Sequence, residues 1–128
     1  MSTKENTWDC GGLEVNVGEI SIGPKGSTKT ASATAGAATL ASTSGVVTSE
    51  SITTAAAGTY TLTLTNTKAV ATDIVQATIN GGTNTAGTPI LLSAVPSAGS
   101  IVFKIYNAHS ANAFNGTLAV GFNIVRGL

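Results

Sequence analysis

The chain has 128 residues, of which 9% are charged and 5% are aromatic, and its six basic and six acidic side chains cancel. It has no basic cluster to neutralise phosphates, and no apolar run near the roughly 20 residues that span a bilayer, so we expect no nucleic-acid and no membrane partner. The length fits one domain, whose surface must be covered mainly by small and uncharged polar residues.

The first 29 residues differ in composition from the rest. They contain seven of the twelve charged residues, the only Trp and the only Cys. Between Gly12 and Gly23, apolar and polar residues alternate, which indicates two short strands separated by Gly18. We therefore divide the chain into an N-terminal β arm with its linker, residues 1–29, and a body, residues 30–128. A two-stranded arm is marginal alone, so its apolar residues are predicted to bind a partner: Trp8, Leu13, Val15, Val17, Ile20 and Ile22.

The body begins with small residues and continues as a series of β-strands. Residues 28–44 are rich in Ala, Thr, Ser and Gly, which favours irregular structure or an edge strand beginning near Ala38. The next strand is expected over Val46–Thr53, with an interruption near Glu50. In Thr59–Thr65, Tyr60, Leu62 and Leu64 alternate with four threonines, so this strand should have one buried and one polar face. Four further strands are predicted over residues 74–79, 90–95, 100–106 and 116–125.

These strands, with turn signals between them and no convincing helix, predict an all-β fold of antiparallel sheets that cover each other. The expected core consists of the inward residues of each strand: Val47, Ile52, Tyr60, Leu62, Leu64, Val75, Ile79, Leu91, Val95, Ile101, Phe103, Ile105, Leu118, Val120, Phe122 and Ile124.

Several strands also carry apolar residues on the face that should point outward. Because apolar residues on both faces imply that both faces are covered, we expect a homo-oligomer with closed symmetry. Threonine presents a hydroxyl and a methyl group, and such a surface can be buried at a lower desolvation cost than a charged one. The expected subunit interface contains Thr61, Thr63, Ile74, Leu92, Val102 and Tyr106.

Titratable residues are too few and too scattered to predict an active site. The single histidine, His109, lies in a polar loop, and a triad of Ser110, His109 and Asp73 has no nucleophile motif to support it. Asp73 is more simply explained as an acceptor for backbone amides of its own turn. One cysteine, Cys10, cannot form an intrachain disulfide or by itself a zinc site. We expect no enzymatic activity, no cofactor and no metal.

Four stretches of the body carry a family resemblance: residues 45–66, residues 80–89, residues 100–102 leading to 107–109, and residues 114–118. In this order they resemble small virion proteins of tailed bacteriophages, of the head decoration or cement type. The resemblance covers about two-thirds of the chain and leaves the arm outside. It implies a jelly-roll-like β-sandwich that assembles, often as a trimer, on the outer surface of a capsid and binds the major capsid protein.

The resemblance thus predicts a structural protein that stabilises the coat lattice and is located in the virion after synthesis in the host cytoplasm. The alternative is a tail-fibre or tail-tip module that recognises a host. That function would place a receptor or glycan site in the loops 80–88 and 107–115, with Phe114 as the exposed aromatic residue.

Overall fold

The computed structural model describes residues 30–126 of the chain. The predicted arm, with Trp8, Leu13, Val15, Val17, Ile20 and Ile22, therefore lies outside the described residues. Residues 30–126 form no helix and eight strands. The strands are β1 (Thr30–Ser32), β2 (Ala37–Thr39), β3 (Ser44–Thr48), β4 (Thr59–Thr65), β5 (Ile74–Gly81), β6 (Pro89–Ser97), β7 (Ser100–Asn107) and β8 (Ala119–Val125).

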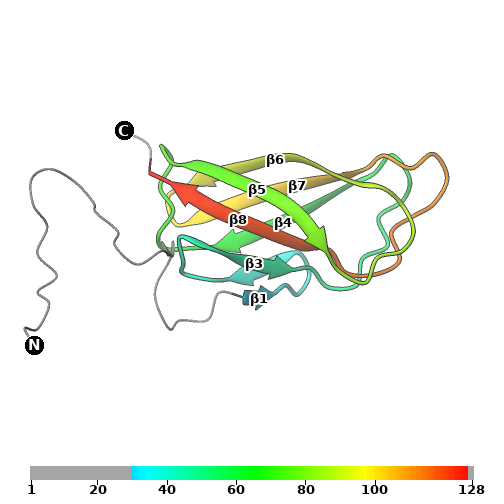
Figure 1. Cartoon of the computed structure of the whole chain (residues 1–128), viewed down its shortest axis with the longest axis horizontal. Coiled ribbons are helices and arrows are strands. Elements are labelled where there is room, and N and C mark those ends of the chain that lie inside the picture. The colour runs from blue at the N-terminus through cyan, green and yellow to red at the C-terminus, as the bar shows by residue number, and fades with distance from the viewer. Residues whose placement is uncertain (1–29, 127–128) are drawn as a thin grey trace, which may run out of the picture.

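Two four-stranded sheets pack face to face, which confirms the predicted β-sandwich (Figure 1). Sheet A has the order β1-β3-β8-β5, and sheet B has the order β2-β4-β7-β6. Only the connection from β6 to β7 stays within one sheet; every other connection between successive strands crosses to the opposite sheet. Because of these crossings, the central strands of one sheet are connected to the central strands of the other by long loops at the ends of the sandwich.

The sequence predicted antiparallel sheets, but each sheet also contains one parallel strand pair. The four pairs β3–β8, β5–β8, β4–β7 and β6–β7 are antiparallel, but β1–β3 and β2–β4 are parallel. The physical reason is the crossing pattern. The chain reverses direction each time it changes sheet, so two strands separated by one crossing strand run the same way when they become neighbours.

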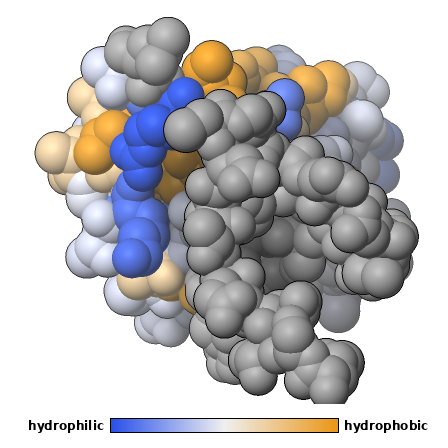
Figure 2. Space-filling model, turned by 60° about the vertical axis from the view of Figure 1, so that its left-hand side comes forward, coloured by the Kyte–Doolittle hydropathy of each residue, from blue (hydrophilic) through white to orange (hydrophobic). Residues whose placement is uncertain are grey.

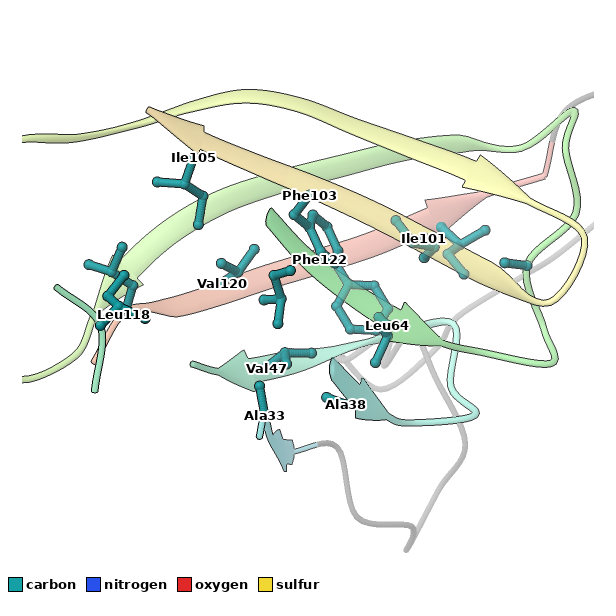
Figure 3. Packing of buried hydrophobic residues seen from close by; sticks show 14 of the residues in the cluster. Ala33, Ala38, Val47, Leu64, Ile101, Phe103, Ile105, Leu118, Val120 and Phe122 are labelled. Carbon is teal, nitrogen blue, oxygen red and sulfur yellow. The ribbon is translucent and has the colours of Figure 1, made fainter. Parts of the chain in front are cut away.

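The core lies between the sheets and is built from the inward side chains of the long strands (Figure 3). Phe103 of β7 and Phe122 of β8 face each other across the sandwich, with ring centroids 6.2 Å apart. Ala33 and Ala38 extend the core toward the short edge strands, where they lie near Val47 and Leu64. Tyr60, Val75, Ile79 and Leu91 are partly buried against this cluster.

The threonine-rich strand has the predicted bounds, Thr59–Thr65, and its Leu62 and Leu64 are fully buried. The expected strand over 46–53 is shorter: β3 ends at Thr48, and Ile52 makes only an isolated bridge to Gly116. Beyond Thr48, Ser49 still bonds Leu118: its amide donates to the Leu118 carbonyl and its hydroxyl accepts from the Leu118 amide, both at 2.8 Å.

Strand β6 contains a bulge that changes which residues face the core. Leu91 pairs with Ile105 and Ser93 pairs with Lys104, so Leu92 is an extra residue without a partner on β7. A bulge shifts the alternation of side chains by one position. Ala94 therefore packs against the core, and Val95, which the sequence pattern placed in the core, is 56% exposed. The assignment of Val95 to the core was wrong for this reason.

The bulge predicts effects of different size for two neighbouring substitutions. Ala94→Asp should lower the free energy of unfolding by about 2 kcal/mol or more, because it places a carboxylate against the core without a partner. Val95→Asp should change it by only about 0.5 kcal/mol. Urea denaturation of both variants measures the difference, and a larger loss for Val95→Asp would show that β6 has the unbulged register.

Candidate functional site

The outer face of sheet B, hereafter the sheet B face, is the most apolar exposed surface that the strand register defines. It is formed by alternate residues of three neighbouring strands. On β6, Ile90, Leu92 and Val95 have exposed fractions of 46%, 55% and 56%. Half-buried Val102 and Tyr106 of β7 lie beside them, and β4 continues the face with its threonines. The face thus passes from an aliphatic margin to a hydroxyl-bearing centre.

The sheet B face carries one charged side chain among the described residues, Lys104. This lysine lies between Thr61 of β4 and Ser93 of β6 in the register. The other side chains of this face carry hydroxyl and aliphatic groups. Covering them has a low desolvation cost, and only the Lys104 ammonium group would be costly to bury. The face is therefore chemically suited to contact with another protein surface.

The structure brings together five of the six residues predicted for the subunit interface. Thr61, Thr63, Leu92, Val102 and Tyr106 all lie on the sheet B face. Ile74 does not: it opens β5 in sheet A, where it pairs with Val125, and both are exposed. Figure 2 shows hydrophobic surface near the top of that view, the side on which β5 and β6 lie in Figure 1. Ile74 cannot join the other five in one flat contact.

The outer face of sheet A differs in chemistry from the sheet B face. Beyond the Ile74–Val125 pair, β5 presents Gln76, Thr78 and Asn80, opposite Asn123 and Gly121 of β8. No charged side chain lies on these described positions. A shallow hollow of about 280 Å³ lies on this face between β5 and β8. Amides and hydroxyls therefore dominate this second face.

The loops at one end of the sandwich are tied together by Asn107, the last residue of β7. Its side chain is fully buried, and its Oδ1 accepts hydrogen bonds from the amides of Thr88 and His109 at 3.0 and 3.1 Å. Its Nδ2 donates to the carbonyls of Thr54 and Asn112 at 3.1 and 2.8 Å. One side chain thus joins the β3–β4, β5–β6 and β7–β8 loops.

A second set of hydrogen bonds closes the same end. Asn115 Oδ1 accepts from the amides of Thr85 and Ala86 at 2.8 and 3.0 Å, and the Asn115 amide donates to Asn84 Oδ1 at 3.0 Å. Thr83 and Thr117 bond each other reciprocally through backbone and hydroxyl groups. The polar residues of these loops are therefore occupied in holding the loops to each other.

Phe114 is buried beneath this network, with 1% of its surface exposed. It lies against Gly87, where an added Cβ would come within 2.7 Å of the ring and where φ is +74°. The expectation of Phe114 as an exposed aromatic for glycan recognition was wrong. The sequence did not predict this burial, because Phe114 lies in a polar loop. No alternating strand pattern includes it that could have indicated an inward side chain.

His109, Ser110 and Asp73 do not come together. His109 follows the end of β7 that pairs with the start of β4, whereas Asp73 lies in the loop after the end of β4. They are at opposite ends of the sandwich. His109 Nδ1 accepts hydrogen bonds from the amides of Ala111 and Asn112 at 3.0 and 2.9 Å, so this nitrogen holds its own loop.

Asp73 has the local role predicted for it, and a partner that was not predicted. Its Oδ2 accepts a hydrogen bond from the Val70 amide at 3.0 Å within the β4–β5 loop. Its side chain is fully buried and lies 3.0 Å from the guanidinium of Arg126, which follows β8. The pair links the loop to the end of sheet A.

Glu50 and Tyr60 form a hydrogen-bonded contact that changes the pKa of the tyrosine. The Tyr60 hydroxyl donates to Glu50 Oε2 at 3.0 Å, and the Gly36 amide donates to Glu50 Oε1 at 3.0 Å. Partial burial of the phenol, followed by the hydrogen bond and the negative charge of Glu50, raises the pKa of Tyr60 well above its usual range. The contact joins the β1–β2 turn, the β3–β4 loop and β4.

Neither a cluster of metal ligands nor a membrane-spanning helix is found in the part of the chain that the structure describes. No three His, Cys, Asp or Glu side chains among residues 30–126 are grouped to hold a metal ion. The same residues contain no helix long and apolar enough to cross a bilayer. Comparison of the chain with protein-family models, with curated proteins and with solved structures finds no match.

Removing the Asn107 side chain should destabilise the whole loop end. Asn107→Ala removes the acceptor of the partly buried Thr88 and His109 amides and the donor to the Asn112 carbonyl, so the free energy of unfolding should fall by about 3 kcal/mol. Asn112→Ala is the matched control: its exposed side chain lies only near His109, and its effect should be within about 0.5 kcal/mol. Equal effects of the two variants in thermal denaturation would contradict the central role of Asn107.

The Tyr60–Glu50 contact predicts a stability effect that depends on pH. Tyr60→Phe should lower the free energy of unfolding at neutral pH by about 1.5 kcal/mol, since it removes a hydrogen bond to a charged group. The folded-state pKa of Tyr60 is raised, so the contribution is fully present below the unfolded-state value of about 10 and is lost as pH rises above it.

The difference in free energy of unfolding between wild type and Tyr60→Phe, called the gap below, should therefore decrease above about pH 10. Denaturant titrations of both proteins across this pH range measure the gap, with Tyr106→Phe on the sheet B face as control. A gap that stays constant across the range would exclude the contact as its source.

Proposed function

We propose that this chain is a structural virion protein that binds the outside of a phage capsid as a homo-oligomer and stabilises the coat lattice. The observation that carries the proposal is the sheet B face, on which Ile90, Leu92 and Val95 lie exposed beside threonines and one lysine. Exposed apolar residues that form one contiguous surface are typical of interaction sites. The family resemblance of the body supplies the partner class.

The sheet B face supports association between copies because five residues of the expected interface lie together on it. The proposed assembly is a trimer, the form that the resemblance implies. A closed assembly would cover the aliphatic margin of β6 and leave the loop ends and the outer face of sheet A for other contacts. The apolar residues of the arm, outside the described residues, are proposed to bind the major capsid protein.

The strand order also supports a jelly-roll-like description of the sandwich. Among strands β3 to β8, the first pairs with the last (β3–β8) in sheet A, and the second pairs with the second-last (β4–β7) in sheet B. The middle two strands, β5 and β6, are edge strands of sheet A and sheet B. This nesting is what results when a long antiparallel ribbon is folded over into two sheets. The alternative function, host recognition by the loops, has less support because Phe114 is buried and the loop amides and hydroxyls bond each other.

Placing a positive charge on the sheet B face should separate the copies. Leu92→Lys should weaken self-association about tenfold or more, equivalent to about 1.4 kcal/mol, because an ammonium group must then lose its hydration in the contact. Thr78→Lys on the outer face of sheet A is the matched control and should leave the association constant unchanged. Sedimentation equilibrium measures both variants.

Binding to the virion is tested separately with the full chain. Gold-labelled protein added to particles that lack it should appear over the head in electron micrographs and should raise the temperature at which the capsids lose their DNA. Label over the tail would support the alternative function. A monomeric wild-type chain that binds neither head nor tail would overturn the proposal.

A further inference from the structure

The sequence contains two Asn-Gly pairs, Asn80–Gly81 and Asn115–Gly116, and the structure places them in opposite environments. In such a pair, the glycine amide nitrogen can attack the side-chain carbonyl carbon of the asparagine, because no Cβ on the following residue hinders the approach. The reaction requires an asparagine side chain that is free to rotate and a local backbone that can bend. The two pairs differ in both respects.

Asn80 is exposed and lies at an irregularity near the end of β5. Ile79 pairs with Val120 and Gly81 pairs with Ala119, so Asn80 is an extra residue without a partner on β8. Gly81 has φ of +129°, and an added Cβ there would meet nothing within 4 Å, so the backbone at this point is open to solvent and unhindered. The Asn80 side chain rests over the glycine Gly121, and its amide forms no hydrogen bond with another side chain of the described residues.

Asn115 has the same neighbour but a fixed side chain. Its Oδ1 accepts two backbone hydrogen bonds, and its Nδ2 donates to the Thr85 hydroxyl at 2.9 Å. Gly116 is buried, and its carbonyl accepts a hydrogen bond from the Ile52 amide at 3.0 Å. An added Cβ on Gly116 would lie 2.7 Å from the backbone of Thr83. Movement of this pair toward ring closure would break the loop network.

We propose that Asn80 is a site of spontaneous deamidation in the folded protein and that Asn115 is protected. The Gly81 nitrogen forms a bond to Cγ of Asn80, the Cγ–Nδ2 bond breaks, and ammonia leaves with the proton from the Gly81 amide. Water then opens the cyclic imide at one of its two carbonyls, which gives aspartate or isoaspartate at position 80. The proposal does not depend on the proposed function.

The modification would place a carboxylate on the outer face of sheet A, where the described positions of β3, β5 and β8 carry no charge. The unmodified chain has a formal net charge of zero, so each event makes the protein acidic. The face that presents Gln76, Thr78 and Asn123 would then repel any acidic surface that it meets. The charge of this face would depend on the age of the protein.

Tryptic peptide mapping tests the proposal, because trypsin separates the two sites. Cleavage after Lys68, Lys104 and Arg126 places Asn80 in the peptide Ala69–Lys104 and Asn115 in the peptide Ile105–Arg126. The full-length protein is incubated at mildly alkaline pH, where the glycine amide is more reactive, under conditions that leave its circular dichroism unchanged. Peptide masses and fragment spectra are then followed over time.

The peptide Ala69–Lys104 should gain the mass that replacement of an amide by a carboxylic acid produces, with fragment ions placing the change at Asn80. The peptide Ile105–Arg126 should not gain it. In denaturant both peptides should gain mass, which would show that the fold protects Asn115. Asn80→Gln should abolish the gain and the accompanying acidic species on ion exchange, since glutamine forms the corresponding ring far more slowly.

Equal gain in both peptides of the folded protein would overturn the proposal, as would a change at Asn84 in place of Asn80. Deamidation of Asn80 in denaturant but not in the folded chain would also overturn it. In that case the irregularity at the end of β5 would not let Asn80 and Gly81 move enough to form the ring.

Discussion

The structure depends on a buried asparagine at each end of sheet B. Asn107 at the end of β7 and Asn66 after β4 are both fully buried, and each side chain bonds backbone groups of loops that are distant in sequence. A chain that crosses between sheets at nearly every connection brings much loop backbone against the ends of the core. Buried backbone amides and carbonyls must be paired, and one amide side chain can both accept and donate. These two residues make the crossings compatible with a dry core.

This constraint explains why the loops that looked like candidate binding sites are closed. Their polar residues bond to one another across β3–β4, β5–β6 and β7–β8, and Phe114 is sealed beneath them. The exposed apolar surface instead lies on the strands, chiefly along β6, where the bulge turns both Leu92 and Val95 outward. The exposed aliphatic side chains of β6 distinguish the sheet B face both from the loops and from the amide-rich face of sheet A.

Prediction from sequence was most successful where a strand alternates regularly. The pattern of Thr59–Thr65 and of Ile101, Phe103 and Ile105 predicted strands β4 and β7 and their buried residues, because side chains of a regular strand alternate between faces. It failed at Val95, where the bulge displaces the alternation, and at Phe114, which lies outside any strand. It grouped Ile74 with interface residues that lie on the other sheet, since strand alternation gives the face of a residue but not its sheet.

The sequence by itself determined that this is an all-β chain with a charge-poor, threonine-rich surface and with more apolar residues than one core can hold, because these properties follow from composition and a period of two. Only the tertiary structure decided which outward residues share a surface, which loops are closed, and that the edge strand pairs β1–β3 and β2–β4 are parallel. Those features arise from contacts between residues far apart in the chain. Pairings of Asn107 with Thr54 and of Glu50 with Tyr60 leave no periodic signal in the sequence that local reasoning could detect.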